Sequence, residues 1–371
     1  MTTCYFETLA AFAVSCLLSA MIIPKISLIA YRRRLFDPLS DRKLHTTHIP
    51  RLGGIAFFPC IIMPISLVIA CHNLCTDSNL LTWEQSTCLL TLFSCLFMLY
   101  LMGMRDDLIG MRYRAKFIIQ TLCSLLLVAS GFCFDNLYGL FGIHKLPHYV
   151  GIPFTVFIIV YIMNAINLID GIDGLASGLS MIAFLAFGCM FVCLSWWLYA
   201  FIAFAALGAL IPFFYYNMFG KPHRGRKVFM GDTGSLTIGL LLAVMAIHLS
   251  MSDPVKEELF PGAIVTAFSF LLVPMLDVVR VVLHRLRNHQ PPFLPDKNHI
   301  HHKFIALGMS QHQALCFILS IACLFIIANT LLASYLSVTV LFLLDVAVWT
   351  AMHFYICLLY TSPSPRDKRQ S

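Results

Sequence analysis

The sequence predicts an all-α integral membrane protein, a single helical bundle with about ten or eleven transmembrane helices. The 371 residues are 59% hydrophobic and only 12% charged, and the mean hydropathy is +0.83. Soluble domains average about 25% charged residues. Long apolar runs follow one another along the chain, and the basic residues between them gather on one side of the implied membrane. These three observations exclude an ordinary soluble domain.

Eleven apolar runs approach the length of about 20 residues that crosses a bilayer as a helix. The division within 176–217 rests on the short break Leu194–Trp197. The first run lacks a basic leader and a clear cleavage site, so we expect it to remain as an anchor. In chain order the runs lie near 5–30, 52–72, 86–104, 117–133, 151–168, 176–194, 197–217, 234–251, 260–283, 314–333 and 338–359.

Residues 1–360 are expected to form one membrane domain. Residues 361–371 are polar, basic and rich in Pro and Ser, so we expect them to be disordered. They resemble translated adapter sequence more than a native terminus.

The distribution of Lys and Arg predicts the orientation. The loops 31–51, 105–116, 218–233 and 284–313, the tail and the adjoining helix ends carry 23 of the 25 basic residues. Basic loops stay in the cytoplasm, so this side is predicted to be cytoplasmic and the N-terminus external. The net charge of +7 therefore reports topology and not nucleic-acid binding.

Most of the 14 cysteines lie inside apolar runs, where they behave as small buried hydrophobic residues. The sequence has no zinc-type CxxC pair. Cys71 and Cys75 flank a predicted external loop, so a disulfide between them is an open alternative.

The stretch Asn164–Gly178, NAINLIDGIDGLASG, joins two apolar runs. Its two amides and two carboxylates follow at three-residue intervals, which places them along one stripe of a helix. Carboxylates at a membrane boundary are costly unless a cation or hydrogen-bond donor meets them. A helix cap followed by a polar loop is the plainer interpretation. The four residues are Asn164, Asn167, Asp170 and Asp173.

The segment Asp106–Lys116, DDLIGMRYRAK, places two adjacent carboxylates before three basic residues. Adjacent carboxylates repel each other unless a cation lies between them. Mg²⁺ binds carboxylate and phosphate oxygens together, so acid followed by base is typical of a metal–diphosphate site. A solvated charged loop is the alternative.

Two further clusters lie on the same side. In Arg42–Gly54, basic residues and His45 precede Gly53–Gly54, whose backbone amides are expected to hold an anion. An ordinary positively charged loop is the alternative. In Lys221–Ser235, KPHRGRKVFMGDTGS, Asp232 stands between glycines before an apolar run. It either approaches a phosphate or ion, or caps the following helix.

The fifth cluster, Pro291–Lys303, contains His299, His301 and His302. Zinc is a weak interpretation because no Glu or Cys partner lies at a useful spacing. Histidines that contact phosphate fit at least as well.

All five clusters fall on the predicted cytoplasmic side, and acid, metal and base together favour phosphoryl transfer. The sequence has no P-loop and no kinase-type glycine loop, so ATP is not indicated. A transporter with intramembrane carboxylates is the main rival, with a polytopic metalloprotease and a structural scaffold behind it. The sequence has no HExxH motif. Of the two carboxylates inside apolar runs, Asp277 is expected to pair with Arg280 and Asp345 to face a neighbouring helix.

Five motifs in this order resemble the polyprenyl-phosphate N-acetylhexosamine-1-phosphate transferases of the MraY/WecA type over nearly the whole chain. They are HxxxIPRLGG from His45, DDLIGMRYRAK, NAINLIDGIDGL, VFMGDTGS and HIHHKF. The IDGIDGL and HIHH forms look more like the WecA-type branch. MraY enzymes usually carry an HHHFE-like motif, whereas Lys303 and Phe304 follow the histidines here and no Glu does.

The resemblance implies that a UDP-N-acetylhexosamine, most often UDP-GlcNAc, gives its sugar-1-phosphate to undecaprenyl phosphate and releases UMP. The product would start a lipid-linked glycan, for example of lipopolysaccharide or the cell wall. It implies Mg²⁺ or Mn²⁺ as cofactor, a multi-pass protein of the bacterial cytoplasmic membrane, a site that faces the cytoplasm, and lipid but no nucleic acid as partners. A homodimer is compatible with the family. The alternative within the family is the phospho-MurNAc-pentapeptide transferase of peptidoglycan synthesis.

The resemblance also implies roles for twelve residues. Asn167 and Asp232 would contact the metal. Asp106 and Asp107 would be the catalytic pair, as base for the lipid phosphate or as metal ligands, and Asp170 and Asp173 would organise nucleotide or metal. The substrate-binding residues would be Lys116, His45, Arg112, His299, His301 and His302.

Overall fold

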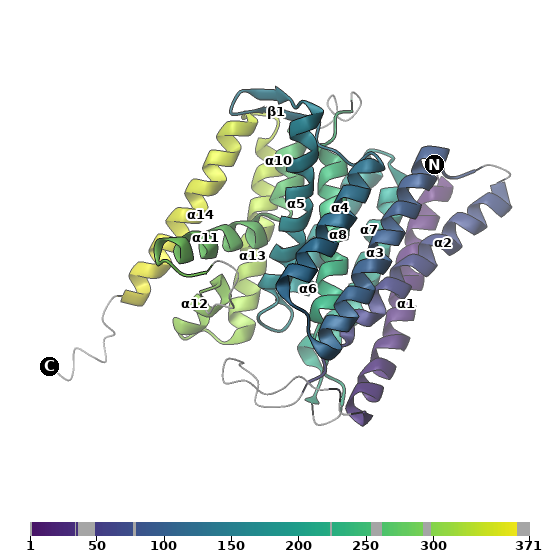
Figure 1. Ribbon diagram of the computed structural model, residues 1–371, viewed down its shortest axis with the longest axis horizontal. Coiled ribbons are helices and arrows are strands. Elements are labelled where there is room, and N and C mark those ends of the chain that lie inside the picture. The colour runs from purple at the N-terminus through teal and green to yellow at the C-terminus, as the bar shows by residue number, and fades with distance from the viewer. Residues whose placement is uncertain are drawn as a thin grey trace.

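The computed structural model describes residues 2–33, 35, 49–76, 79–222, 225–253, 262–291 and 298–361. These residues form a helical bundle with one β-hairpin (Figure 1). The elements are α1 (Thr2–Arg32), the 3₁₀ helix η1 (Gly53–Ala56), α2 (Phe57–Thr76), α3 (Trp83–Ile109), α4 (Tyr113–Ala129), β1 (Asn136–Leu140), β2 (Ile143–Lys145), α5 (His148–Ile169), α6 (Leu175–Cys193), α7 (Trp197–Phe219), α8 (Gly231–Ser250), α10 (Ala263–Ser269), α11 (Leu272–Arg287), α12 (Ile300–Ala306), α13 (Gln311–Leu332) and α14 (Val338–Thr361).

The expected all-α bundle is confirmed. Within the described ranges, nine helices are long and apolar enough to cross a membrane, and the bent pair α10–α11 gives a tenth. Each of the eleven apolar runs falls on a helix or on this pair. The structure therefore differs from eleven straight spans at two places, the run near 260–283 and the run near 117–133.

The run near 260–283 is broken. α10 and α11 meet at an angle of 73°. Pro274 lies in the first turn of α11 and has no N–H to donate to the carbonyl of Phe270, so one continuous helix would lose a hydrogen bond and clash there. α11 consequently runs across the bundle instead of along it (Figure 1).

The run near 117–133 becomes α4, a helix of 17 residues. At 1.5 Å per residue it is about 26 Å long, short of the roughly 30 Å hydrocarbon core of a bilayer. Its outer face is apolar and exposed, as Ile118 and Leu122 show. α4 is thus a lipid-facing helix that is shorter than its neighbours.

α8 is the most enclosed helix and lies in the middle of the bundle (Figure 1). Glycines let α3 and α5 approach it closely. A Cβ on Gly103 of α3 would lie 2.4 Å from the Cα of Thr233, and one on Gly239 would lie 2.8 Å from the Cα of Met163 in α5. Such contacts exclude any larger residue. They fix the end of α3 and the end of α5 against the start of α8.

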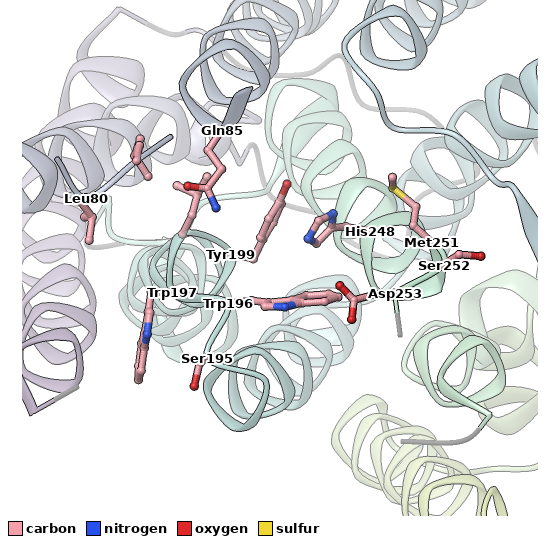
Figure 2. Close-up of a pocket in the computed structure, with 12 residues that line it drawn as sticks. Leu80, Gln85, Ser195, Trp196, Trp197, Tyr199, His248, Met251, Ser252 and Asp253 are labelled. Carbon is pink, nitrogen blue, oxygen red and sulfur yellow. The ribbon is translucent and has the colours of Figure 1, made fainter. Parts of the chain in front are cut away.

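A cavity of about 390 Å³ opens at the other end of α3 and α8 (Figure 2). Its lining includes Gln85, Trp196, Tyr199 and His248, and the rings of Tyr199 and His248 stack with centroids 3.6 Å apart. Gln85 and Asp106 are separated along α3 by about 30 Å of helix. The cavity is therefore remote from the predicted site residues.

Two further predictions from the sequence concern Asp345 and the pair of Cys71 and Cys75. Asp345 accepts hydrogen bonds from the Nδ2 of Asn329 at 2.9 and 3.1 Å, which confirms that it faces a neighbouring helix. Cys71 and Cys75 are both free thiols, so the structure has no disulfide between them.

Candidate active site

Asp107, in the last turn of α3, caps the start of α8. Its Oδ1 accepts a hydrogen bond from the backbone N–H of Asp232 at 2.8 Å. Its Oδ2 accepts from the N–H and the hydroxyl of Thr233 at 3.0 and 2.6 Å. The N-cap residue of α8, Met230, has no side-chain cap, so Asp107 satisfies amides that a helix start leaves without partners. Asp107 thereby ties α3 to α8.

Gly231 makes this cap possible. Its φ is +70°, a conformation that glycine tolerates best. A Cβ there would lie 2.5 Å from the Oδ2 of Asp107 and 2.2 Å from the carbonyl oxygen of Arg51. The glycine before Asp232 in the GDTG motif is therefore required by packing.

Lys116, in the first turn of α4, places its ammonium between two carboxylates. Its Nζ lies 2.7 Å from the Oδ2 of Asp106 and 2.5 Å from the Oδ2 of Asp232. All three side chains are largely buried. Asp232 thus turns its carboxylate toward Lys116, and the alternative that it caps its own helix is wrong. Residues more than 100 positions apart meet at one point.

Asn167, in the last turn of α5, completes the contacts of Asp232. Its Nδ2 donates to the Oδ1 of Asp232 at 3.1 Å and to the Oγ of Ser235 at 2.8 Å. In this orientation the amide nitrogen faces the carboxylate, and a metal contact through the oxygen would require the amide to turn over. Asn164, three residues earlier, instead donates to the Oε1 of Gln120 at 2.7 Å. The predicted stripe therefore divides between site and helix packing.

The IPRLGG segment lies beside the FMGD segment through its backbone. Gly53 and Gly54 donate their N–H groups to the carbonyls of Phe229 and Met230, each at 3.0 Å, and Phe229 donates to Pro50 at 2.9 Å. The expectation that these glycine amides hold an anion is wrong, because both already have backbone partners. The segment positions the loop before α8.

The turn between α5 and α6 holds Asp170 and Asp173. Gly174, with φ +80°, begins α6 and donates its N–H to the Oδ1 of Asn217 at 2.7 Å. The Nδ2 of Asn217 donates to the carbonyl of Val228 at 2.9 Å. The buried Asn217 side chain thus joins this turn to the segment that leads into α8.

The two carboxylates of the turn have different environments. Asp173 pairs with Lys227, whose Nζ lies 2.5 Å from its Oδ2. Burial and, to a smaller extent, the nearby charge of Asp173 raise the pKa of Asp170 to about 7, against the opposing effect of Arg51. Asp170 consequently keeps its proton to a higher pH than an ordinary carboxyl does.

Asp277 holds the histidine segment in place. Its Oδ2 lies 2.8 Å from the Nδ1 of His299, and its Oδ1 accepts from the N–H of Ile300 at 3.0 Å. Arg280 donates to the same Oδ1 at 2.8 Å and also to the carbonyl of Asn298. The predicted pair of Asp277 and Arg280 is confirmed, and it fixes the start of α12.

His301 packs directly on the α5–α6 turn. A Cβ on Gly171 would lie 2.2 Å from its Nε2 and 2.3 Å from its Cε1. Burial lowers the pKa of His301 to about 3, with further lowering from His302 and His299. His301 is therefore neutral at physiological pH, and the histidine segment meets the turn that carries Asp170.

One predicted substrate residue, Arg112, lies apart from this network. Arg112 is exposed at the start of α4. His45 lies outside the described residues. Two residues that the structure brings to the site, Lys227 and Asn217, were not singled out by the sequence. Lys227 belongs to the quoted basic cluster before α8, and Asn217 is a polar residue at the end of an apolar run, so both signals were present.

The acidic cluster fits a hard divalent cation. Carboxylate oxygens of Asp106, Asp107 and Asp232 lie within 4.8 Å of one another. In the part of the chain that the structure describes, this is the one group of three or more His, Cys, Asp or Glu side chains with that geometry. Mg²⁺ prefers such oxygen ligands. Among these described residues, the three histidines form no such group.

Comparison with known proteins gives one family. The family model for glycosyl transferase family 4 matches residues 89–250. A relative from Bacillus subtilis, named a probable undecaprenyl-phosphate N-acetylglucosaminyl 1-phosphate transferase, is 32% identical over 338 residues, or 90% of this chain and 88% of the relative.

Two further relatives agree. An undecaprenyl-phosphate alpha-N-acetylglucosaminyl 1-phosphate transferase from Pasteurella multocida is 33% identical over 77% of this chain and 75% of its own length. A decaprenyl-phosphate N-acetylglucosaminephosphotransferase from Mycobacterium tuberculosis is 31% identical over 80% and 74%. The matched region spans the acidic cluster of α3, α4 and α8 together with Asn167, and on this evidence the chain belongs to glycosyl transferase family 4.

Proposed function

We propose that this protein transfers N-acetylglucosamine-1-phosphate from UDP-GlcNAc to undecaprenyl phosphate and releases UMP, at the cytoplasmic face of a bacterial inner membrane. The observation that carries the proposal is the meeting of Asp106, Asp232 and Lys116 at one end of membrane-spanning helices. A polyprenyl chain needs an apolar phase and a nucleotide sugar needs water. A charged cluster at the end of the bundle serves both substrates.

The transfer balances as a single displacement at phosphorus. An oxygen of the lipid phosphate attacks the sugar-bearing phosphorus of the UDP-sugar and forms a new P–O bond. The bond between that phosphorus and the bridging oxygen breaks, and UMP leaves with this oxygen. Such a reaction needs positioned charge more than covalent chemistry from the protein. Asp106 would accept a proton if the lipid phosphate still carries one, and Lys116 would offset phosphate charge.

When bound, Mg²⁺ would supply neutralisation of the diphosphate charge. Asp106 and Asp232 would hold it, with Asn167 once its amide has turned over. Asp107 would act by keeping the start of α8 in place, because both of its oxygens already accept bonds from that helix.

A direct assay tests the proposal. Purified protein in detergent is incubated with labelled UDP-GlcNAc, undecaprenyl phosphate and Mg²⁺, and UMP and lipid-linked sugar are measured. We expect equal amounts of both products, loss of activity with EDTA, and recovery on adding Mg²⁺. Full activity in EDTA would contradict the metal-dependent reaction.

Variants localise the activity. Asp106→Asn and Asp232→Asn should each abolish transfer without changing insertion into the membrane. Asp345→Asn is the matched control, since Asp345 is also a buried carboxylate but accepts its hydrogen bonds from Asn329 of α13, away from the cluster. The site assignment fails if both site variants remain as active as this control.

Two further measurements address the donor and the orientation. A panel with UDP-GlcNAc, UDP-GalNAc and UDP-MurNAc-pentapeptide should show highest turnover with UDP-GlcNAc. External UDP-GlcNAc should support transfer in inside-out vesicles and not in right-side-out vesicles, because a charged nucleotide does not cross the bilayer. The reverse pattern would place the site on the external face.

A further inference from the structure

We propose that Lys116 is an internal cation that occupies the metal-free acidic cluster, and that a divalent ion displaces it and frees its ammonium for a substrate phosphate. The inference rests on the proposed function, because it concerns how the cluster accepts its metal. In this proposal Lys116 is a positioning residue with two alternative partners. Its ammonium pairs with the carboxylates before the metal binds and with a substrate phosphate afterwards.

The hydrogen bonds of the cluster place the ammonium of Lys116 between the carboxylates of Asp106 and Asp232. Both oxygens of Asp107 accept bonds from the start of α8. The Oδ1 of Asp232 accepts from Asn167, and its Oδ2 binds Lys116. The Oδ2 of Asp106 binds the same ammonium. An ion that bridges Asp106 and Asp232 through the two oxygens that hold the ammonium would therefore take the place of Lys116.

Lys116 is the partner that can leave. The donors to Asp107 belong to the backbone and the Thr233 side chain at the helix start, where movement would uncap α8. The ammonium of Lys116 instead sits on a flexible four-carbon stem. Mg²⁺ binds oxygen at about 2.0–2.1 Å, so it would sit closer to the shared oxygens than the ammonium does and repel it.

Displacement gives the ammonium a second role. Lys116 remains anchored in the first turn of α4, so its Nζ stays within side-chain reach of the cluster. A metal-bound diphosphate brings new negative charge to the same place. The freed ammonium can then bind phosphate as a point charge. The metal would thus bind before phosphate binds tightly. In the protein without metal, the ammonium of Lys116 would stay with the carboxylates and would not bind phosphate.

Metal affinity tests the exchange without any catalytic readout. Mn²⁺ binding to the purified full-length protein is measured by electron paramagnetic resonance in the absence of substrates. Lys116→Met removes the competing charge but keeps the length of the side chain. It should bind Mn²⁺ at least about tenfold more tightly, because it leaves partly buried carboxylates without their counter-charge.

The matched control is Arg114→Met. Arg114 lies in the same turn of α4 and is exposed, and its Nε donates to the hydroxyl of Tyr113 at 3.3 Å. The Arg114→Met variant loses one positive charge near the cluster but no contact to a carboxylate of the cluster. Its Mn²⁺ affinity should therefore equal that of the wild type. Equal tightening in both variants would show a general charge effect and would overturn the exchange.

The wild-type protein provides a second test that does not depend on a variant folding. An amine-acylating reagent followed by mass spectrometry should modify Lys116 several-fold faster with Mg²⁺ than with EDTA. Lys145, an exposed residue of β2 outside the site, serves as the internal reference and should not change. Unchanged acylation of Lys116, or Mn²⁺ affinity in Lys116→Met no tighter than wild type, would overturn the proposal.

These outcomes separate the two proposals. If the wild type releases UMP in a metal-dependent reaction but Lys116→Met binds Mn²⁺ no more tightly, the exchange is overturned and the proposed function stands. Tighter Mn²⁺ binding in that variant, with no transfer from any UDP-sugar by the wild type, supports the exchange and overturns the proposed function.

Discussion

Replacing Gly171 by alanine adds one methyl group at the contact between the histidine segment and the α5–α6 turn. The new Cβ would lie 2.2 Å from the Nε2 of His301, whereas ordinary contacts begin at 3.4 Å. The buried ring would have to move by roughly 1 Å, and overpacking of this kind costs about 1–3 kcal/mol. A displacement of this size beside a reaction centre lowers turnover about 100-fold.

A double-mutant cycle measures the contact. Unfolding in sodium dodecyl sulfate is followed for the wild type, Gly171→Ala, His301→Ala and the double variant. Gly171→Ala should destabilise the wild type by about 1–3 kcal/mol and the His301→Ala background by about zero, because the clashing ring is then gone. Transfer activity of Gly171→Ala is measured in parallel.

Gly178→Ala is the matched control. A Cβ at Gly178 would meet two methyl carbons of Leu319 at 3.1 Å, the far end of a flexible side chain. It should cost less than about 1 kcal/mol and preserve activity. The reasoning is refuted if Gly171→Ala costs the same in both backgrounds, or behaves like the control.

Three further predictions follow from the same network. Burial raises the pKa of Asp170 to about 7 in the folded protein, from an ordinary value of 3.8. Between these two values the folded state binds a proton that the unfolded state has lost. The free energy of unfolding should therefore fall as the pH rises through 4–7 in metal-free buffer. Asp170→Asn should abolish this fall in melting temperature, and a wild type with a flat profile over that range would contradict it. Asn217→Ala should destabilise the protein by about 1–3 kcal/mol in detergent unfolding, because it removes two buried hydrogen bonds; no change would show that the bonds do not form. Asp277→Ala should lower the free energy of unfolding by about 3–5 kcal/mol, because it leaves Arg280 partly buried without its partner, and it should also lower transfer. Protease cleavage at Asn298 should become faster in this variant. An unchanged cleavage rate would argue against a role of Asp277 in holding the histidine segment.

Local patterns were sufficient to predict the long helices, but they favoured a loop where the structure has the short helix α12. Apolar runs of bilayer length marked every span, and three-residue spacing marked the pair of Asp277 and Arg280 within α11. The break between α10 and α11 had a local signal in Pro274 that the hydropathy of the run concealed. Hydropathy averages over a window, whereas a helix breaks at one missing N–H.

The internal arrangement of the site was beyond local patterns. Which carboxylate caps α8 and which one pairs with Lys116 depends on how α3, α4 and α8 approach one another. Asp107 and Asp232 are 125 residues apart, and nothing near either one indicates that the first accepts the amide of the second. Family resemblance put Asp106, Lys116 and Asp232 on one list, but only the fold shows which residues hold structure and which face one another across the cluster.

The shortness of α4 gives membrane composition a way to act on the enzyme. Lipids beside its 17 residues would have to compress, or the helix would have to sink, and either response would strain the first turn, which carries Lys116. Activity in vesicles should therefore depend on acyl-chain length, with an optimum in shorter chains than the remaining spans alone would select. A cell that lengthens its fatty acids would thereby slow the proposed transfer without any change in the sequence of the protein.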